Sequence, residues 1–219
     1  MKSNLFFPYL TRQELSQYHN RNGSFYADYT SNYERIAQDC LKRCVYCDAT
    51  ERECGGDNFS LDHFRPRKVF AEKFDGVLVT HPYNLYLSCQ KCNVLKSSEW
   101  YGCVNTSDGF SYINNRGFID RFKHKSEDYF LVNSDGEIVC SNPLGPTNYM
   151  IKKLYLNRPN RIFLRKKRII ENRIKEIKET INTLSNSIMN DFEMHLISSD
   201  FALERINKIR DIQNILLSL

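Results

Sequence analysis

The chain has 219 residues, a net charge of +5, and ordinary globular fractions of hydrophobic (41%) and charged (26%) residues. This length suits one domain, or a small domain with appendages. No run approaches the roughly 20 apolar residues of a membrane span, and Pro8 breaks the short apolar opening, so we expect no signal peptide. We therefore expect a cytoplasmic protein with no membrane partner and with reduced cysteines.

The first 43 residues are predicted to form a helical support. Thr11 stands three residues before Glu14, a capping-box pattern that predicts a short helix. Aromatic and apolar residues then recur at helical spacing and predict a helix over about 25–42, with the aromatic stripe in the core. The recurring residues are Tyr26, Tyr29, Tyr33, Ile36, Ala37, Cys40 and Leu41.

Two C-x-x-C motifs account for four of the eight cysteines. CVYC contains Cys44 and Cys47, and CQKC contains Cys89 and Cys92. In a reduced compartment, two such pairs predict one tetrahedral structural zinc site with four sulfur ligands. A redox C-x-x-C or four buried thiols are the alternatives. We expect the other cysteines to be small buried side chains. They are Cys40, Cys54, Cys103 and Cys140.

Between the two cysteine pairs, the chain predicts two strands joined by a long hairpin loop. NFSLDHF, residues 58–64, forms the first strand and ends on the pair Asp62 and His63. NLYLS, residues 84–88, forms the second strand and runs into the second cysteine pair. An acid beside an imidazole at a strand end has ordinary explanations, a surface strand end or a polar pair in a loop.

The joined pattern D-H-x-x-P … N-L-x-x-x-C-x-x-C-N-x-x-K, over roughly residues 40–100, resembles the HNH endonucleases. That resemblance implies an α+β fold with a ββα-metal core, stapled here by the four-cysteine zinc site. It also implies a metal-dependent endonuclease that hydrolyses phosphodiester bonds. His63 would be the general base, and Asp62 and Asn93 would hold a catalytic Mg²⁺ or Mn²⁺. Asn84 would brace the loop that carries His63.

The chemistry agrees with these roles. An imidazole with an ordinary pKa of about 6.5 can accept a proton from water near neutral pH. Carboxylate and amide oxygens suit Mg²⁺ and Mn²⁺. Asp62 has a turn or capping role as its alternative, and Asn93 has a helix N-cap role.

Basic residues near the motif are candidates for phosphate binding. Arg65, Arg67 and Lys68 form a basic loop, and Lys96 lies one turn beyond Asn93. A solvated loop and an ordinary exposed helix lysine are the alternatives. His81 is read as a loop histidine with an undecided role.

After residue 118 the chain predicts a hairpin and then helices. Asp135-Gly136 separates two apolar runs within 118–141, which is a hairpin signal. Thr147 would cap one helix, and Pro159 suits the first turn of the next. A heptad seam and a further amphipathic helix, separated near 198–199, predict a long C-terminal helical hairpin. The seam residues are Ile170, Ile174, Ile177, Ile181, Leu184 and Ile188, and those of the second helix are Ile206, Ile209, Ile212 and Leu216.

These observations predict three regions: helical support over 1–43, the zinc-stapled nuclease core with its hairpin extension over 44–145, and the helical region over 146–219. A narrower resemblance is to HNH nuclease subunits of Septu-type and retron-linked anti-phage systems, which work with a separate ATPase. Arg67 and Asp62 depart from the Lys and Glu usual there. The expected partners are nucleic acid, DNA first, an ATPase subunit, and a second copy through the C-terminal helices. The alternative function is a non-catalytic zinc module that binds nucleic acid or protein.

Overall fold

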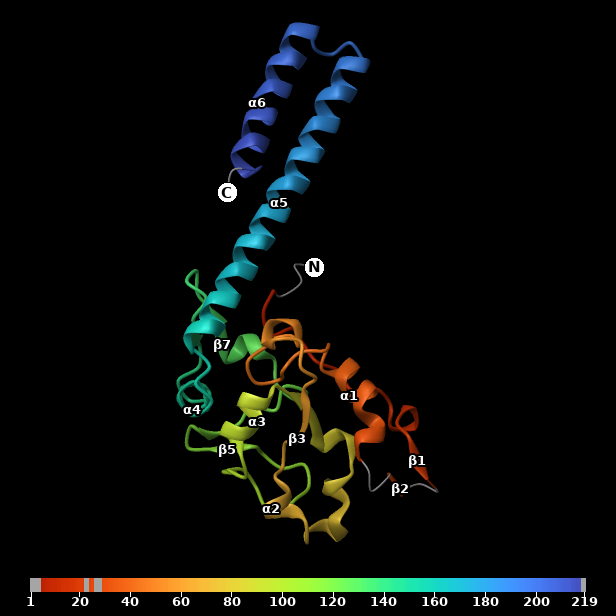
Figure 1. Ribbon diagram of the computed structural model, residues 1–219, viewed down its shortest axis with the longest axis vertical. Helices are drawn as coiled ribbons and strands as arrows, with labels where there is room; N and C mark the ends of the chain where they lie inside the picture. Colours follow the sequence, from red (N-terminus) through yellow and green to blue (C-terminus); the bar gives the residue numbers. More distant parts are fainter. Residues whose placement is uncertain (1–4, 22–23, 26–28, 218–219) are drawn as a thin grey trace. The chain divides into compact units, whose positions relative to one another are not determined.

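The computed structural model describes residues 5–21, 24–25 and 29–217 (Figure 1). The chain divides into two compact units, Met1–Arg165 and Lys166–Leu219. The first combines short helices with small antiparallel sheets, and the second is helical, so the mixed class expected from the sequence is confirmed. Within the described residues, no helix is both long and apolar enough to cross a membrane.

The N-terminal region contains less helix than predicted. Only a 3-10 turn, Leu15–Gln17, follows Thr11, because Arg12 and the neighbouring Gln13 are bonded to Asp39. The predicted capping box is therefore wrong. Strands β1 (Asn20–Arg21) and β2 (Ser24–Phe25) pair next, and a 3-10 turn (Tyr29–Asn32) leads into α1 (Tyr33–Asp39).

Helix α1 is shorter than the helix predicted over 25–42. Leu41 and Lys42 adopt positive φ angles of 53° and 52°, a conformation that ends a right-handed helix. At the other end, Tyr26 lies outside the described residues. The helix therefore supplies only part of the expected support, with Ile36 and Ala37 buried beneath it.

Strands β3 (Ser60–His63) and β4 (Leu85–Ser88) pair antiparallel, with Asp62 opposite Tyr86 and His63 opposite Leu85. Helix α3 (Gln90–Lys96) follows β4 directly and packs against β3. The segment between the strands is partly helical rather than one loop. It contains α2 (Arg67–Phe70) and the 3-10 turns Phe74–Val79 and Pro82–Asn84, and another 3-10 turn, Arg52–Cys54, precedes β3.

Two small hairpins complete the first unit. In the first hairpin, β5 (Tyr112–Ile113) pairs with β6 (Arg116–Gly117). A 3-10 turn (Ser126–Asp128) then leads to the second hairpin, in which β7 (Phe130–Val132) pairs with β8 (Ile138–Cys140). The second pair confirms the hairpin predicted around Asp135-Gly136. Helix α4 (Thr147–Lys153) begins after Pro146, and the Thr147 hydroxyl donates to the Tyr129 carbonyl. The predicted Thr147 cap is therefore wrong.

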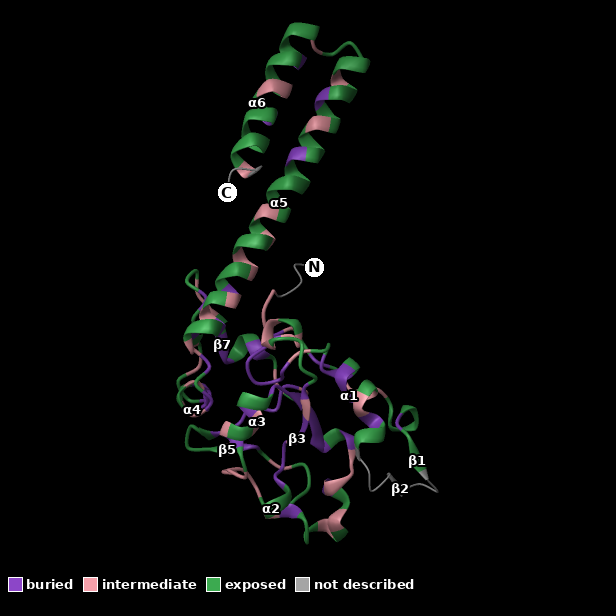
Figure 2. Cartoon of the chain, in the orientation of Figure 1, coloured by how far each residue is buried: buried purple, intermediate pink, exposed green. Residues whose placement is uncertain are grey.

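The core of the first unit surrounds β3 and β4, where Figure 2 shows buried positions on both strands. Phe64, fully buried, stacks on Tyr86 with ring centroids 4.6 Å apart, and Trp100 meets Phe64 edge-on at 5.6 Å. Aromatic pairs of this kind add to the stabilisation from burial. These aromatic contacts anchor the β3–β4 pair, and β3 ends on Asp62 and His63.

The second unit is a helical hairpin formed by α5 (Pro159–Glu193) from Lys166 onward and α6 (Ser199–Leu217). Pro159 is the first residue of α5, as predicted, and α6 begins at the predicted break. The predicted heptad seam of α5 is only partly buried, because α6 packs against only some of its residues. Buried residues are Ile181, Ile188, Ala202 and Ile209, whereas Ile170, Ile177 and Leu184 are exposed.

Candidate functional site

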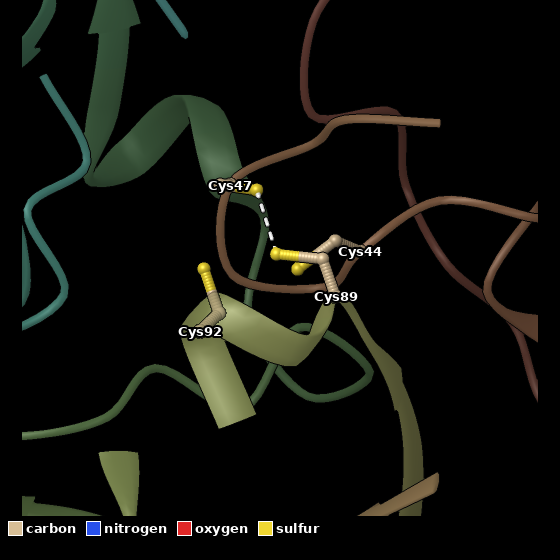
Figure 3. Close-up of side chains that lie close together, drawn as sticks. All are labelled: Cys44, Cys47, Cys89 and Cys92. Atoms are coloured by element: carbon tan, nitrogen blue, oxygen red, sulfur yellow. Dashed lines mark hydrogen bonds between the residues drawn. The ribbon is translucent and has the colours of Figure 1, made fainter. Parts of the chain in front are cut away.

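The four predicted cysteine ligands come together. Cys44, Cys47, Cys89 and Cys92 are buried, and their sulfur atoms lie within 4.8 Å of one another (Figure 3). A tetrahedral zinc ion with Zn–S bonds of about 2.3 Å holds its sulfurs roughly 3.8 Å apart. The Cys47 and Cys89 sulfurs are 3.8 Å apart. These residues would therefore hold a structural zinc ion.

Backbone hydrogen bonds explain why the two pairs meet. The turn after α1 closes when the Cys44 N–H donates to the Ala49 carbonyl, and Val45 N–H donates to the Leu87 carbonyl of β4. Cys89 then caps α3 and Cys92 lies in its first turn. Burial raises the pKa of the Cys44 thiol well above its ordinary value, so thiolates there need a cation close by.

An arginine that the sequence analysis did not single out borders this cluster. Arg158 places one guanidinium nitrogen 3.9 Å from the sulfurs of both Cys47 and Cys89. Four thiolates around one divalent ion carry a net charge of −2, which a neighbouring guanidinium offsets. Nothing in the sequence around Arg158, which directly precedes Pro159, predicts its contact with the cysteine cluster.

His63 ends β3 with a half-buried ring. Its Nε2 lies 2.8 Å from the Val79 carbonyl oxygen. A carbonyl only accepts hydrogen bonds, so Nε2 carries the proton and Nδ1 is the basic nitrogen of the neutral ring. Burial lowers the pKa of His63, and the Val79 carbonyl opposes that shift. The bond to Val79 therefore orients the neutral ring, with Nδ1 as its basic nitrogen.

Asn84 clamps the segment that follows His63. Its side-chain oxygen accepts from the Arg65 N–H at 2.8 Å, and its amide nitrogen donates to the carbonyls of Arg65 at 3.1 Å and Leu78 at 2.8 Å. The side chain is buried, and all of its polar atoms are engaged with backbone. These bonds make Asn84 a brace for the loop beside His63.

Asp62 belongs to a buried polar cluster on the opposite side of β3 from His63, because successive strand residues face opposite ways. The Tyr46 hydroxyl donates to Asp62 Oδ2 at 2.5 Å, and the Lys96 ammonium lies 3.1 Å from the same oxygen. Lys96 also donates to the His63 carbonyl at 2.9 Å. Burial lowers the pKa of Lys96, and Asp62 opposes that shift.

The predicted phosphate-binding residues are not brought together at the surface. Lys96 is 0% exposed and Arg65 is 5% exposed. Arg65 donates to the Gly109 carbonyl at 2.5 Å, and its guanidinium carbon lies 5.1 Å from the Trp100 ring centroid. Arg67, at the start of α2, is exposed. Lys96 and Arg65 thus form their bonds within the interior, whereas Arg67 and Lys68 face solvent.

The residues predicted to hold the divalent ion come from two neighbouring elements, Asp62 from β3 and Asn93 from α3. Asn93 is half-buried and lies one turn before Lys96, hence on the same face of α3. The Asp62 carboxylate is already bonded by Tyr46 and Lys96. Over the described part of the chain, the cysteine cluster is the one group of three or more His, Cys, Asp or Glu side chains positioned to share an ion.

No protein-family model, curated protein or solved structure matches this chain. The likeness to HNH nucleases therefore rests on the quoted motif residues alone.

Proposed function

We propose that the chain is a metal-dependent endonuclease that hydrolyses phosphodiester bonds of nucleic acid, with DNA as the expected substrate. The observation that carries the proposal is the His63 ring, fixed by the Val79 carbonyl at 2.8 Å at the end of β3. This bond fixes the direction of the ring and leaves Nδ1 as the nitrogen that can accept a proton.

In this proposal His63 Nδ1 takes a proton from the attacking water. The ring then becomes an imidazolium, and its Nε2–H stays bonded to the Val79 carbonyl, which stabilises the positive charge. Asn84 holds the adjoining backbone so that the ring keeps its direction. Arg67 is exposed nearby in sequence and is the candidate contact to substrate phosphate.

A divalent ion, when bound, would offset charge on the phosphate and on the leaving oxygen. Asn93 and Asp62 are the proposed ligands, and Asp62 would have to share its carboxylate with Lys96. The proposal therefore requires Lys96 to shift or to remain beside the ion as a second positive charge.

One observation favours a different function, a zinc-stapled binding module. The ion pair between Asp62 and Lys96 is buried and complete without any further ion. A module of this kind would keep the cysteine cluster for folding and would have no use for the His63 tautomer. Metal dependence separates the two functions, because a binding module needs no divalent ion beyond the structural zinc.

Plasmid cleavage tests the proposal directly. Purified wild type, His63→Ala and His195→Ala are each incubated with Mg²⁺, with Mn²⁺, or without a divalent ion, and zinc content is measured alongside. His195 is exposed and follows α5, so its replacement controls for loss of a histidine elsewhere. We expect cleavage that needs the added ion, disappears in His63→Ala and persists in His195→Ala. Equal cleavage by His63→Ala and wild type, or no cleavage by zinc-loaded wild type, would contradict the proposal.

A further inference from the structure

The helical hairpin of Lys166–Leu219 leaves part of its apolar surface uncovered. Its seam residues, such as Ile181 and Ile209, are buried between α5 and α6. Several large apolar side chains beside this seam are between 40% and 51% exposed. They include Ile170, Ile177 and Leu184 on α5 and Phe201 and Ile212 on α6. The three on α5 recur every seven residues, so they form one line along that helix.

The two sides of the hairpin differ in polarity. A hollow of about 320 Å³ opens on one side, between α5 and α6. Its lining residues are Lys178, Ile181, Asn182, Gln213, Asn214 and Leu216. Successive helix residues are about 100° apart, so Ile177 lies on the other side of the seam from Lys178. Ile212 is placed in the same way relative to Gln213. One groove of the hairpin is therefore polar and the opposite groove is apolar, and an uncovered apolar groove marks an interaction surface.

Charge is divided between the two halves of α5. Residues 166–178 contain six Lys or Arg and two Glu, whereas residues 179–193 contain three acidic residues and no Lys or Arg. Residues 212–217 of α6, which share the hollow with Lys178, carry no charged side chain that would cancel the basic half. Such a helix is complementary to an antiparallel copy of itself, because the basic half of each then lies beside the acidic half of the other.

We propose that a second copy of this chain docks antiparallel on the apolar groove formed by Ile170, Ile177 and Leu184 of α5 and Ile212 of α6. The two hairpins then form a four-helix bundle related by a two-fold axis. This inference goes beyond the proposed nuclease activity and does not rest on it.

The paired length of the helices is sufficient for such an interface. Helix α6 has 19 residues and so runs beside α5 over roughly 28 Å. Two packed helices, each about 10 Å across, present a face roughly 20 Å wide, which is on the order of 560 Å² per copy. Two copies bury about 1,100 Å² in total, just above the roughly 1,000 Å² that a specific interface needs. Because the area is at the low end, the dimer should dissociate on dilution.

Sedimentation equilibrium of the full, zinc-loaded chain over a range of protein concentrations tests the proposal. We expect the mass to rise from that of one chain, 25.9 kDa, toward twice that value. Ile177→Glu places a charge in the apolar groove and should keep the mass of one chain. Asn182→Glu places the same charge on the polar side of α5 and should associate as wild type does. Circular dichroism checks that both variants keep their helix, and Ile212→Glu repeats the test from α6.

Salt dependence tests the antiparallel arrangement. Raising NaCl from about 0.01 M to about 0.1 M shortens the screening length from about 30 Å to about 10 Å. The dissociation constant of the dimer should then rise several-fold, because the opposite halves attract each other less. A parallel dimer would bring like halves together, so salt would tighten it. The proposal is overturned by a single-chain mass at every concentration, by association of Ile177→Glu and Ile212→Glu equal to that of wild type, or by tighter association in salt.

Discussion

The two units of the chain differ in how far apart in the sequence their stabilising contacts reach. In Met1–Arg165, the half-buried Arg12 donates to the distant Leu85 carbonyl and the buried Arg121 donates to the Val45 carbonyl. In Lys166–Leu219, the ion pairs join residues one helical turn apart, such as Lys167 with Glu171 and Lys208 with Glu204. The first unit therefore depends on long-range closure, and the second depends on local helix formation and one apolar seam.

The substitution with the largest expected effect should unfold the first unit and leave the second unit folded. Cys44→Ser removes a ligand from the buried cluster, and structural zinc sites contribute roughly 10–16 kcal/mol, comparable to a whole domain's stability of about 5–15 kcal/mol. We expect Met1–Arg165 to unfold while helical signal from Lys166–Leu219 persists. Fluorescence of Trp100, the single tryptophan, reports the first unit, and circular dichroism reports helix. Wild-type melting with full zinc content would show that the four-cysteine assignment is wrong.

The next effect concerns the charge pair buried beneath His63. Lys96→Met keeps an unbranched apolar stem, removes the ammonium group and leaves the Asp62 carboxylate without its cation, which costs about 3–5 kcal/mol for a buried pair. Denaturant unfolding followed by Trp100 fluorescence measures this loss. In the double variant Asp62→Asn/Lys96→Met no uncompensated charge is left, so most of the lost stability should return. A double variant as unstable as Lys96→Met would argue against the pair as the cause.

A smaller effect is expected in the seam of the second unit. Ile188 is 6% exposed between α5 and α6, and Ile→Ala at a buried site costs about 2 kcal/mol at the lower end of the observed range. We place it at the lower end because a two-helix seam relaxes more easily than an enclosed core. Helix melting by circular dichroism should shift down, with Trp100 fluorescence unchanged. Leu184→Ala, at a 51% exposed position, is the matched control and should shift less.

The smallest effect is at the exposed helix pairs. Lys167 and Glu171 are more than half exposed and 3.8 Å apart, so Lys167→Ala should change the free energy of unfolding by less than about 0.5 kcal/mol. The same thermal melt, repeated at high and low salt, measures it. A loss comparable to that of Ile188→Ala would mean that ion pairs, not the seam, hold the hairpin together.

The sequence predicted features that repeat locally or carry fixed spacing. The C-x-x-C pairs located the four-cysteine cluster, Asp135-Gly136 located the β7–β8 hairpin, and Pro159 located the start of α5. In each case a short pattern contains the physical cause, whether ligand spacing, turn conformation or the first-turn tolerance of proline.

Several other features that depend on distant partners were not predicted. Thr11 and Glu14 formed a capping pattern, but the Arg12–Asp39 pair determines the local structure there. Lys96 has the spacing of an exposed helix lysine, yet the Asp62 carboxylate draws it inside. Tyr46 appeared only as a spacer within CVYC, and its hydroxyl bond to Asp62 depends on β3 lying across the knuckle. Such contacts follow from tertiary packing, which local propensity does not contain.

The placement of the cysteine pairs at the two ends of the β3–β4 segment has a consequence for the order of folding. Each pair alone offers two sulfurs, and the tetrahedron is complete only when the whole intervening segment has closed on itself. Closing a long loop costs entropy that grows slowly with its length, and an ion already captured by one pair lowers the barrier to meeting the other. The rate at which the newly made chain reaches its native state should therefore rise with the concentration of free zinc.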